Sequence, residues 1–598
     1  MGNRRNRRRS KVDAQRTADN LTDRTTAHSV IVDDNATVLS RSLWSIAGLF
    51  VFWSCGFATL RASDLWWHLA AGRWIVTHCL FPAQDPFSFT AHHRWVLDAW
   101  LSDVLLYQWT HSFGLYSLVY WKWIIVVATC FLLVNVCRWI SCERASAYLA
   151  VMFAAVVAAP FLDIRPHLFS LLFLVLLFFL VLHPEPLRRS RLLLVLSLFL
   201  VWANLHPGFI LGLAVLPVLL ARRYFRPAER RMAITVTAGA CLVTLANPAG
   251  INVYTQPLIY ALRPDDSFRS IGEWLPPFTS GGIVSPLYPV ALVLFAASAV
   301  VLLLRRERAT FLPIIGVATL TMVMSLLSRR LIPAFALCQA ITLAAAIAPF
   351  SKRWLRKAPF FALPAALTVV GGLVLLRYPL QPRAFHHLSA EYTFPVESVN
   401  FIETNGLTGN IFAYYNWGGY LHWRMPGQMK VFIDGRASAV FDEATYRDYL
   451  TVMSMRRGWE SIIERPSVEY VLWPIAAAPI SRSLVQSGRW RFLYKDAVSI
   501  LLVRADTSLP PLHETPDSPY RDLALGVSAV DRKALSEAEA YFRRALAEMP
   551  YLEPACSDLA IVKMREGMPA EADKVLVRCD TIFPDRGRRQ RATQRVPR

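Results

Sequence analysis

The sequence predicts a polytopic α-helical membrane protein with an α/β domain and a C-terminal pair of helical repeats on the outer side of the membrane. Of its 598 residues 54% are hydrophobic and the mean hydropathy is +0.34, so the chain is far more apolar than a soluble protein. Apolar stretches recur between residues 43 and 376. Beyond residue 377 the pattern changes to short segments, which predicts soluble domains after the membrane body.

Eleven apolar stretches are candidate membrane spans, although several are shorter than the ~20 residues that a full crossing usually needs. The pair on either side of Asn204 and Pro207 allows two interpretations: two tilted spans that meet at a turn, or one broken, re-entrant element. The candidate spans are residues 43–60, 115–136, 145–161, 168–183, 191–204, 208–221, 232–246, 286–304, 311–327, 331–349 and 358–376.

The basic residues between the spans predict how the chain is oriented. Loops rich in Lys and Arg stay in the cytoplasm, and the basic gaps fall on the same side as the Arg-rich segment 1–42, which is predicted to be a disordered cytoplasmic tail. These gaps are residues 138–144, 188–191, 222–231, 305–308 and 352–357. An odd number of spans then places outside everything after residue 377, together with the loops 61–114, 162–167, 204–208, 247–285 and 328–330.

Charge and cysteine usage exclude two other classes of protein. The formal net charge of +21 does not indicate nucleic-acid binding, because the cations lie mainly in the first segment and in short loops beside the spans. The nine cysteines are scattered, mostly inside spans, with neither metal-ligand spacing nor a disulfide framework. Only Cys556 and Cys579 are expected to face each other, across a pair of helices.

The segments beyond residue 377 predict two soluble units. Short strands at 409–414, 430–433, 468–473, 491–494 and 498–503 alternate with helical stretches at 396–404, 444–455 and 481–487, which indicates an α/β domain over residues 377–506. A proline-punctuated linker follows at 507–518. In residues 519–586 a 34-residue period relates Ala538, Phe542, Ala545 and Pro550 to Ala572, Leu576, Cys579 and Pro584, which predicts two tetratricopeptide-type repeats. Residues 587–598 are predicted to be a basic, disordered tail.

The first outer loop, residues 61–114, holds the strongest catalytic candidates. Asp64 and His68 directly follow the first span, with Trp66 and Trp67 between them. An ionisable group at that depth is a functional candidate by default, and the alternative is an aromatic belt with a solvated carboxylate. Asp85 lies between Pro82 and Pro86, so a rigid turn presents it as a possible general base or merely as a turn residue. The short apolar run 101–107 is expected to form helices in the outer interface, and His92 and His93 are expected to be surface histidines.

Cations in the other outer loops break the orientation pattern and suit an anionic ligand. Guanidinium groups match phosphate oxygens, although pairing with Asp163 or with lipid headgroups is the alternative. The candidate ligand-binding residues of these loops are Arg165, His167, Asn204, His206, Glu273, Arg329 and Arg330. In the α/β domain, Asn416 and Trp417 precede paired glycines, and Asp434 and Arg436 follow a strand, where substrate-binding residues commonly lie. Turn formation alone is the other explanation of these two motifs.

Together these features resemble the C-type (GT-C) glycosyltransferases, which are polytopic enzymes with an acidic residue and interface helices in the first outer loop and often a soluble outer domain. More narrowly, the chain is similar to a set of bacterial membrane proteins over roughly residues 43–505. The shared strings are Asp64–His68, Asp85–Phe89, Arg165 with Pro166, Asn204 with His206, Asn416–Tyr420 and Asp434–Arg436.

The resemblance implies transfer of a hexosyl or pentosyl group from a polyprenyl-phosphate donor to a glycan, lipid or protein acceptor at the outer face of the bacterial inner membrane. Asp64 would deprotonate the acceptor hydroxyl, or help to hold a divalent metal such as Mg²⁺ or Mn²⁺. The leaving phosphate would be neutralised by Arg165, His167, Arg329 and Arg330. The α/β domain would cap the site and bind the acceptor, and the repeats would recruit a protein partner.

Two other functions agree with parts of the sequence. The chain could be a non-catalytic scaffold for cell-envelope assembly, because tetratricopeptide units bind partners. It could also be a transporter of a carrier lipid, but transporters place ionisable residues near the middle of the bilayer, and here the candidate polar groups lie in outer loops.

Overall fold

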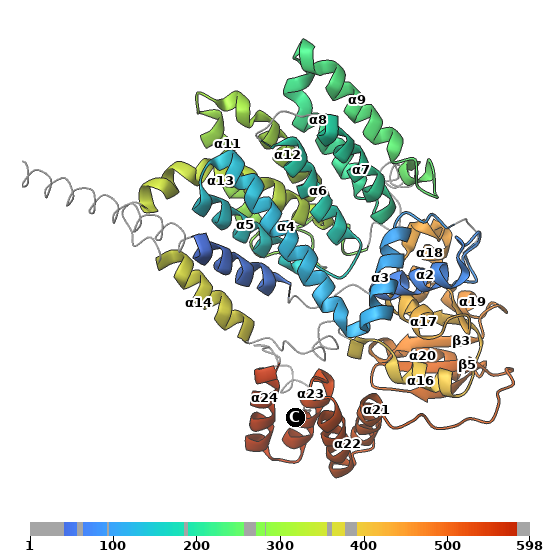
Figure 1. Ribbon diagram of the computed structural model, residues 1–598. Coiled ribbons are helices and arrows are strands. Elements are labelled where there is room, and N and C mark those ends of the chain that lie inside the picture. Colours follow the sequence, from blue (N-terminus) through green and yellow to red (C-terminus); the bar gives the residue numbers. More distant parts are fainter. Residues whose placement is uncertain are drawn as a thin grey trace, which may run out of the picture.

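The computed structural model describes residues 41–56, 64–91, 95–183, 189–255, 271–281, 283–355, 362–376 and 391–582. The predicted cytoplasmic tail, His92, His93 and the basic segment 587–598 lie outside these residues. The elements divide into a large helical body, a mixed sheet with its own helices, and four C-terminal helices (Figure 1).

Helix occupies each of the eleven candidate spans. The helices are residues 41–55, α4 (Leu118–Ser141), α5 (Arg144–Ala158), α6 (His167–Val181), α7 (Arg189–Leu205), α8 (Phe209–Tyr224), α9 (Pro227–Val243), α11 (Tyr288–Leu303), α12 (Arg308–Leu327), α13 (Ile332–Leu355) and α14 (Ala362–Leu376). Within the described residues, four stretches are long and apolar enough to cross a membrane: Leu115–Ser141, Arg144–Phe161, Arg308–Leu327 and Arg329–Arg353. The apolar helices α6, α11 and α14 are shorter, so the full count of eleven crossings stays a prediction.

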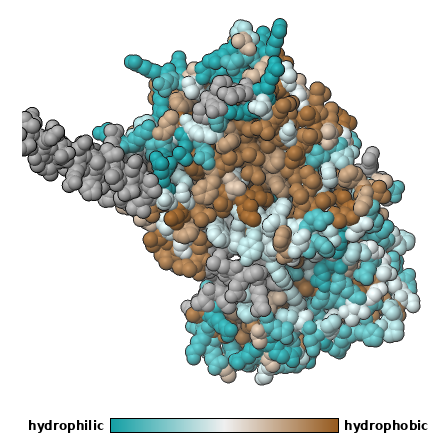
Figure 2. All heavy atoms as spheres, viewed as in Figure 1, coloured by the Kyte–Doolittle hydropathy of each residue, from teal (hydrophilic) through white to brown (hydrophobic). Residues whose placement is uncertain are grey.

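The helical body packs around α13, which lies against α4, α5, α11 and α12. Small side chains let neighbouring backbones approach closely in a membrane, and α5 and α13 each carry a row of buried alanines: Ala147, Ala150, Ala154, Ala336, Ala340 and Ala344. Figure 2 shows hydrophobic residues gathered over this body and hydrophilic residues over the sheet and the C-terminal helices. This distribution of hydropathy is typical of a helical body that lies in a membrane and of a sheet domain and C-terminal helices that face water.

The first outer loop folds into two helices, α2 (Asp64–His78) and α3 (Trp100–Phe113), which lie between the helical body and the sheet (Figure 1). Where they cross, a Cβ atom on Gly72 would lie 2.0 Å from the carbonyl oxygen of Asp103, so only glycine permits this approach. The other face of α2 packs on α17 (Gly418–Arg424) through Leu65, Trp66 and Leu69. The predicted helices of this loop thus carry the sheet domain on the membrane body.

The α/β domain contains a five-stranded mixed sheet in the order β2-β1-β3-β5-β4. β1 (Gly409–Ala413) pairs in parallel with β2 (Met429–Val431) and β3 (Tyr470–Pro474), whereas β5 (Ser499–Arg504) runs antiparallel to β3 and to β4 (Trp490–Lys495). The predicted small sheet is confirmed at all five strands. Its helices are α16 (Val396–Thr404), α17, α18 (Glu443–Met453), α19 (Trp459–Ile463) and α20 (Ala478–Gln486).

The first outer loop also extends this sheet. Ser88 forms a parallel bridge with Val431 of β2, the Val431 N–H donates to the Phe87 carbonyl oxygen at 3.0 Å, and the Phe89 N–H donates to the Val431 carbonyl oxygen at 3.3 Å. The edge of the sheet is therefore covered by a segment more than 300 residues away in sequence, as exposed edges generally require.

Four helices close the described chain: α21 (Pro519–Asp531), α22 (Leu535–Glu548), α23 (Glu553–Arg565) and α24 (Pro569–Ile582). Consecutive helices pack on each other, and Cys556 of α23 faces Cys579 of α24, as expected from the sequence; the two form a disulfide. The group leans on the sheet domain, where Lys495 Nζ lies 2.6 Å from Asp531 Oδ2. The assignment of these helices as tetratricopeptide repeats remains a prediction.

Candidate functional site

Three of the predicted residues meet at the outer end of the helical body. The guanidinium of Arg165, in the gap before α6, donates through Nη2 to Asp64 Oδ2 at the start of α2 and through Nη1 to Glu273 Oε1 at 2.6 Å. Glu273 lies in the described loop 271–281. The side chains of Arg165, Asp64 and Glu273 are 12%, 17% and 25% exposed, so the cluster is sheltered but open to a ligand.

The two neighbouring arginines of the loop before α13 have different surroundings. Arg329 is fully buried, and its guanidinium donates to the carbonyl oxygens of Pro276, Thr279, Gly281 and Ile283. Its predicted role as a phosphate ligand is therefore wrong, because every face of the group holds the loop 276–283 together. Arg330 lies with its guanidinium carbon 4.8 Å from the centre of the Trp274 ring, and within the described residues that guanidinium makes no hydrogen bond.

Histidines surround this cluster. His68 Nδ1 lies 2.6 Å from Asp103 Oδ1, and the two side chains share a buried hydrogen bond. His206 Nδ1 accepts from the Gly208 N–H at 3.0 Å and from the Ser170 hydroxyl at 2.7 Å. Asp103 was not among the predicted site residues, because nothing local in the sequence links it to His68.

Two other predicted residues serve as local supports. His167 Nε2 donates to the Phe161 carbonyl oxygen at 2.8 Å. Asn204 accepts from Trp100 Nε1 at 2.7 Å and donates to the carbonyl oxygens of Leu200 and Ala246. The Asn204 amide therefore ties α7 to the first outer loop, and its predicted substrate contact does not fit these partners.

The charges in the outer site shift one another's proton affinity. Burial raises the pKa of Asp64, although Arg165 opposes the shift. Burial of Glu273 is outweighed by Arg165 and Arg330, so its pKa falls to about 2. Burial, with Arg165 and Arg330, lowers the pKa of His68 well below its usual value, so the imidazole is neutral at pH 7. The site thus combines a basic carboxylate, a neutral imidazole and the guanidinium of Arg330.

A second cluster, which we call the tether, joins the first outer loop to the sheet. Arg436 Nη2 and Nε donate to the two oxygens of Asp434 at 2.6 and 2.9 Å. Arg436 also donates through both terminal nitrogens to Asp85. His422 Nε2 lies 2.9 Å from Asp434 Oδ2. The side chains of all four are at most 1% exposed. The guanidinium of Arg436 also stacks 4.8 Å from the Trp95 ring centre.

The tether corrects three predicted roles. Asp85 was expected to be catalytic, and Asp434 and Arg436 to bind substrate, but their polar atoms bond one another in a dry interior and offer no group to a ligand. Arg436 lowers the pKa of Asp434 more than burial raises it, so the pair stays ionised. These residues instead fix the position of the loop between them.

That loop places Gly435 directly against Asp64, the predicted catalytic residue. A Cβ atom on Gly435 would lie 2.8 Å from Asp64 Oδ1 and 3.6 Å from the Trp67 ring, and one on Gly418 would lie 2.5 Å from Asp434 Cβ. The glycines thus permit the close approach that the sequence suggested. The tether therefore holds a strip of sheet-domain backbone over Asp64.

The remaining predicted residues lie apart from Asp64 or serve packing. Trp66 is buried and its ring lies edge-on to that of Tyr420, with centres 5.0 Å apart. Trp417 is buried and donates from Nε1 to the Thr393 carbonyl oxygen at 3.1 Å. Asn416 is exposed. Tyr415, which the sequence did not single out, is half-buried and lies close enough to Asp64 for the two groups to interact electrostatically.

The acidic residues of the site do not fit a divalent metal. Magnesium prefers several oxygen ligands around one ion, whereas here the guanidinium of Arg165 already lies between Asp64 and Glu273. Among the residues that the structure describes, no group of three or more His, Cys, Asp or Glu side chains is placed to hold a metal. We therefore derive no step through Mg²⁺ or Mn²⁺.

No family model matches the sequence, and no curated protein matches it. Among solved structures, the oligosaccharyltransferase AglB from Archaeoglobus fulgidus, in complex with an inhibitory peptide and a dolichol-phosphate, aligns over 88% of this chain and 86% of its own, at 12% identity and a TM-score of 0.53. The Archaeoglobus fulgidus oligosaccharyltransferase tethered with an acceptor peptide aligns over 79% and 74%, at 13% identity and a TM-score of 0.51. ArnT from Cupriavidus metallidurans bound to undecaprenyl phosphate aligns over 80% and 98%, at 12% identity and a TM-score of 0.46.

The chain has the GT-C fold. The likeness to AglB covers most of the chain, which confirms the GT-C-type fold expected from the arrangement of its spans, first outer loop and soluble domain. At these identities the likeness concerns the fold alone, so the chemistry has to be argued from the residues of this chain.

The tether predicts a large loss of stability when its cation is removed. Replacing Arg436 by Met leaves the two buried carboxylates of Asp85 and Asp434 without their shared cation, which should cost about 3–5 kcal/mol. Thermal unfolding of the purified protein in detergent measures the loss. Arg447→Met is the matched control, because Arg447 is 64% exposed in an i,i+4 pair and should change the stability by less than about 0.5 kcal/mol. Equal unfolding temperatures for both variants would contradict the tether.

Proposed function

We propose that the protein is a membrane glycosyltransferase that moves a sugar from a polyprenyl-phosphate donor to an acceptor at the outer face of the plasma membrane. The observation that carries this proposal is that one carboxylate and one guanidinium close enough to interact electrostatically lie under a backbone cover. Asp64 and Arg330 supply these two groups, and Gly435 supplies the cover.

Arg330 is the group that we assign to the leaving phosphate. Its guanidinium is stacked on Trp274 but forms no hydrogen bond within the described residues, whereas Arg165 is already shared by two carboxylates. A stacked guanidinium keeps its donor edge for phosphate oxygens. Fixed positive charge aimed at the leaving group lowers the barrier most in a partly dry site.

Asp64 is the group that we assign to the acceptor. Arg165 fixes its Oδ2, so the carboxylate keeps one orientation, and burial raises its pKa, which makes it a better base than a solvated aspartate. Asp64 would take the proton of the acceptor hydroxyl as the oxygen attacks the anomeric carbon and the sugar–phosphate bond breaks. The phosphate leaves with the bonding electron pair and is held by Arg330.

His68 supports the same step from the next turn of α2. Residues four apart lie on one face of a helix, so His68 and Asp64 face the same side. The Asp103 carboxyl lies 2.6 Å from His68 Nδ1 and fixes the orientation of the imidazole. We assign Asp103 and His68 to positioning roles beside Asp64.

The donor class and the compartment are part of the proposal. AglB has been solved with a dolichol-phosphate, a polyprenyl-type phosphate, which supports such a donor here. The disulfide between Cys556 and Cys579 supports an outer, oxidising location for the C-terminal helices, because disulfides seldom persist in the cytosol. We therefore propose the bacterial inner membrane, with a glycan, lipid or protein acceptor outside.

Replacing Asp64 by Asn should lower the turnover of sugar transfer by about 10²- to 10⁴-fold, because the amide cannot accept the proton. Transfer from a radiolabelled polyprenyl-phosphate sugar by the purified protein in lipid vesicles measures the effect. Asp448→Asn, on the exposed face of α18, is the control and should retain full turnover. Unchanged turnover of the Asp64 variant at equal protein level would contradict the assignment.

The pH dependence of transfer should show an acid limb set by Asp64. A general base works only when ionised, so the rate is present above its pKa and is lost as the pH falls through it. Because burial raises the pKa of Asp64, that loss should begin above the range of an ordinary aspartate. Rates from pH 4 to 8 test this point, and the residual activity of Asp64→Asn should lack this limb. If the variant keeps the limb, another group is the base.

A further inference from the structure

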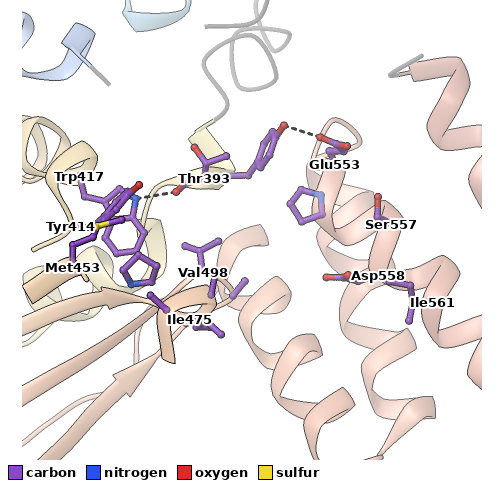
Figure 3. Close-up of a pocket in the computed structure, with 16 residues that line it drawn as sticks. Thr393, Tyr414, Trp417, Met453, Ile475, Val498, Glu553, Ser557, Asp558 and Ile561 are labelled. Carbon is purple, nitrogen blue, oxygen red and sulfur yellow. Dashed lines mark hydrogen bonds between the residues drawn. The ribbon is translucent and has the colours of Figure 1, made fainter. Parts of the chain in front are cut away.

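The sheet domain borders the outer site on the side of Asp64. Tyr414 and Trp417 line a cleft of about 760 Å³ between this domain and α23 (Figure 3), whereas Tyr415 interacts electrostatically with Asp64. The surroundings of Arg330 are different, because the groups that interact with its guanidinium lie in the outer loops that join the membrane helices. These groups are Asp64, His68, Asp98, Arg165, His167, His206 and Glu273.

His206, which the proposed mechanism does not use, lies in the turn between α7 and α8. The start of α3 holds this turn in place, because the Ser102 hydroxyl donates at 2.5 Å to the carbonyl oxygen of the residue before His206. The next residue of α3, Asp103, lies 2.6 Å from His68 Nδ1 on α2. The first turn of α3 therefore connects His206 with the helix that begins at Asp64.

Hydrogen bonds fix the tautomer of His206. Its Nδ1 accepts from the Gly208 N–H at 3.0 Å and from the Ser170 hydroxyl at 2.7 Å, and Ser170 Oγ accepts from Nε1 of the fully buried Trp202 at 2.8 Å. A neutral imidazole carries one proton, so an accepting Nδ1 leaves that proton on Nε2. A Cβ atom on Gly208 would lie 2.2 Å from Ser170 Oγ and 2.8 Å from His206 Nδ1, so this arrangement requires glycine.

His206 is thus a neutral hydrogen-bond donor with a fixed direction. Burial, followed by the charge of Arg330, lowers the pKa of its imidazole well below the usual value. Within the described residues its Nε2 has no hydrogen-bond partner, because both bonds of the ring are made at Nδ1. The neighbouring His167 does not offer the same group, since its Nε2 donates to the Phe161 carbonyl oxygen and its Nδ1 is left as an acceptor. An N–H beside a guanidinium suits an anionic oxygen.

We propose that His206 donates a hydrogen bond from Nε2 to an oxygen of the leaving phosphate, next to the guanidinium of Arg330. The inference rests on the proposed function, because it adds a second contact to the phosphate site assigned to Arg330. The guanidinium supplies the charge, and the imidazole supplies a bond whose direction is set by Ser170 and Gly208. Because both groups are held before the ligand arrives, little side-chain freedom is lost on binding.

The test compares the affinity of the purified full-length protein in detergent for two probes, a polyprenyl phosphate and the polyprenol that lacks the phosphate. His206→Asn removes the donor at the position of Nε2 and should weaken binding of the polyprenyl phosphate about tenfold or more. His206→Gln places an amide N–H near that position and should lose less than about threefold. Binding of the polyprenol should be the same for both variants and the wild type, because it has no phosphate oxygen to accept the bond.

Two further variants make each outcome decisive. His111→Asn, at the exposed end of α3, is the matched control and should change neither affinity. Unchanged phosphate binding by His206→Asn would overturn the inference, and so would an equal loss for the polyprenol, which would indicate disturbed packing. If Arg330→Gln alone weakens phosphate binding, the proposed phosphate site stands and His206 takes no part in it. If neither variant weakens it, the phosphate site itself is wrong.

Discussion

The geometry of the outer site depends on one interaction, the bridge from Arg165 to Asp64 and Glu273. Asp64 begins α2, Arg165 precedes α6, and Glu273 lies in the loop before α11. A single guanidinium therefore joins three parts of the chain that are about 100 residues or more apart in sequence. Taking one cation and two carboxylates partly out of water is favourable only when each is bonded. The bridge satisfies all three and still leaves the guanidinium of Arg330 for a ligand.

A second buried arginine, Arg436, joins the first outer loop to the sheet domain. The side chains of the outer bridge are partly exposed to solvent. In the tether, by contrast, Arg436, Asp85 and Asp434 are buried and their charged groups bond one another. Gly435 connects the two, because its neighbours are fixed in the tether while its backbone covers Asp64. The sheet domain therefore contributes to the outer site by position and exclusion of water, and its own charged groups do not take part.

The sequence predicted the elements well because their signals are local. The apolar stretches and the alternating strand segments depend on neighbouring residues, and helices and strands lie where these patterns placed them. The two central charge pairs depend on contacts between residues about 100 positions or more apart, Asp64 with Arg165 and Asp85 with Arg436. No periodic pattern in the sequence indicates those contacts, and the sequence therefore predicts a catalytic role for Asp85.

Two adjacent arginines show again that the sequence does not predict contacts between distant segments. Arg329 and Arg330 are chemically identical and adjacent, yet the first is enclosed by backbone carbonyl groups and the second is available. Only the course of the loop 276–283 separates them. In the same way, Asp103 could not be linked to His68 before the crossing of α2 and α3 at Gly72 was known.

The most direct test of the account is the affinity of the purified protein for a polyprenyl phosphate, measured by native mass spectrometry or by quenching of tryptophan fluorescence. Replacing Arg330 by Gln removes charge-assisted hydrogen bonds and should weaken binding about tenfold or more. Replacing Asp64 by Asn should not weaken it, since the carboxylate only repels the phosphate. Equal affinity of the wild type and the Arg330 variant would contradict the proposed phosphate site.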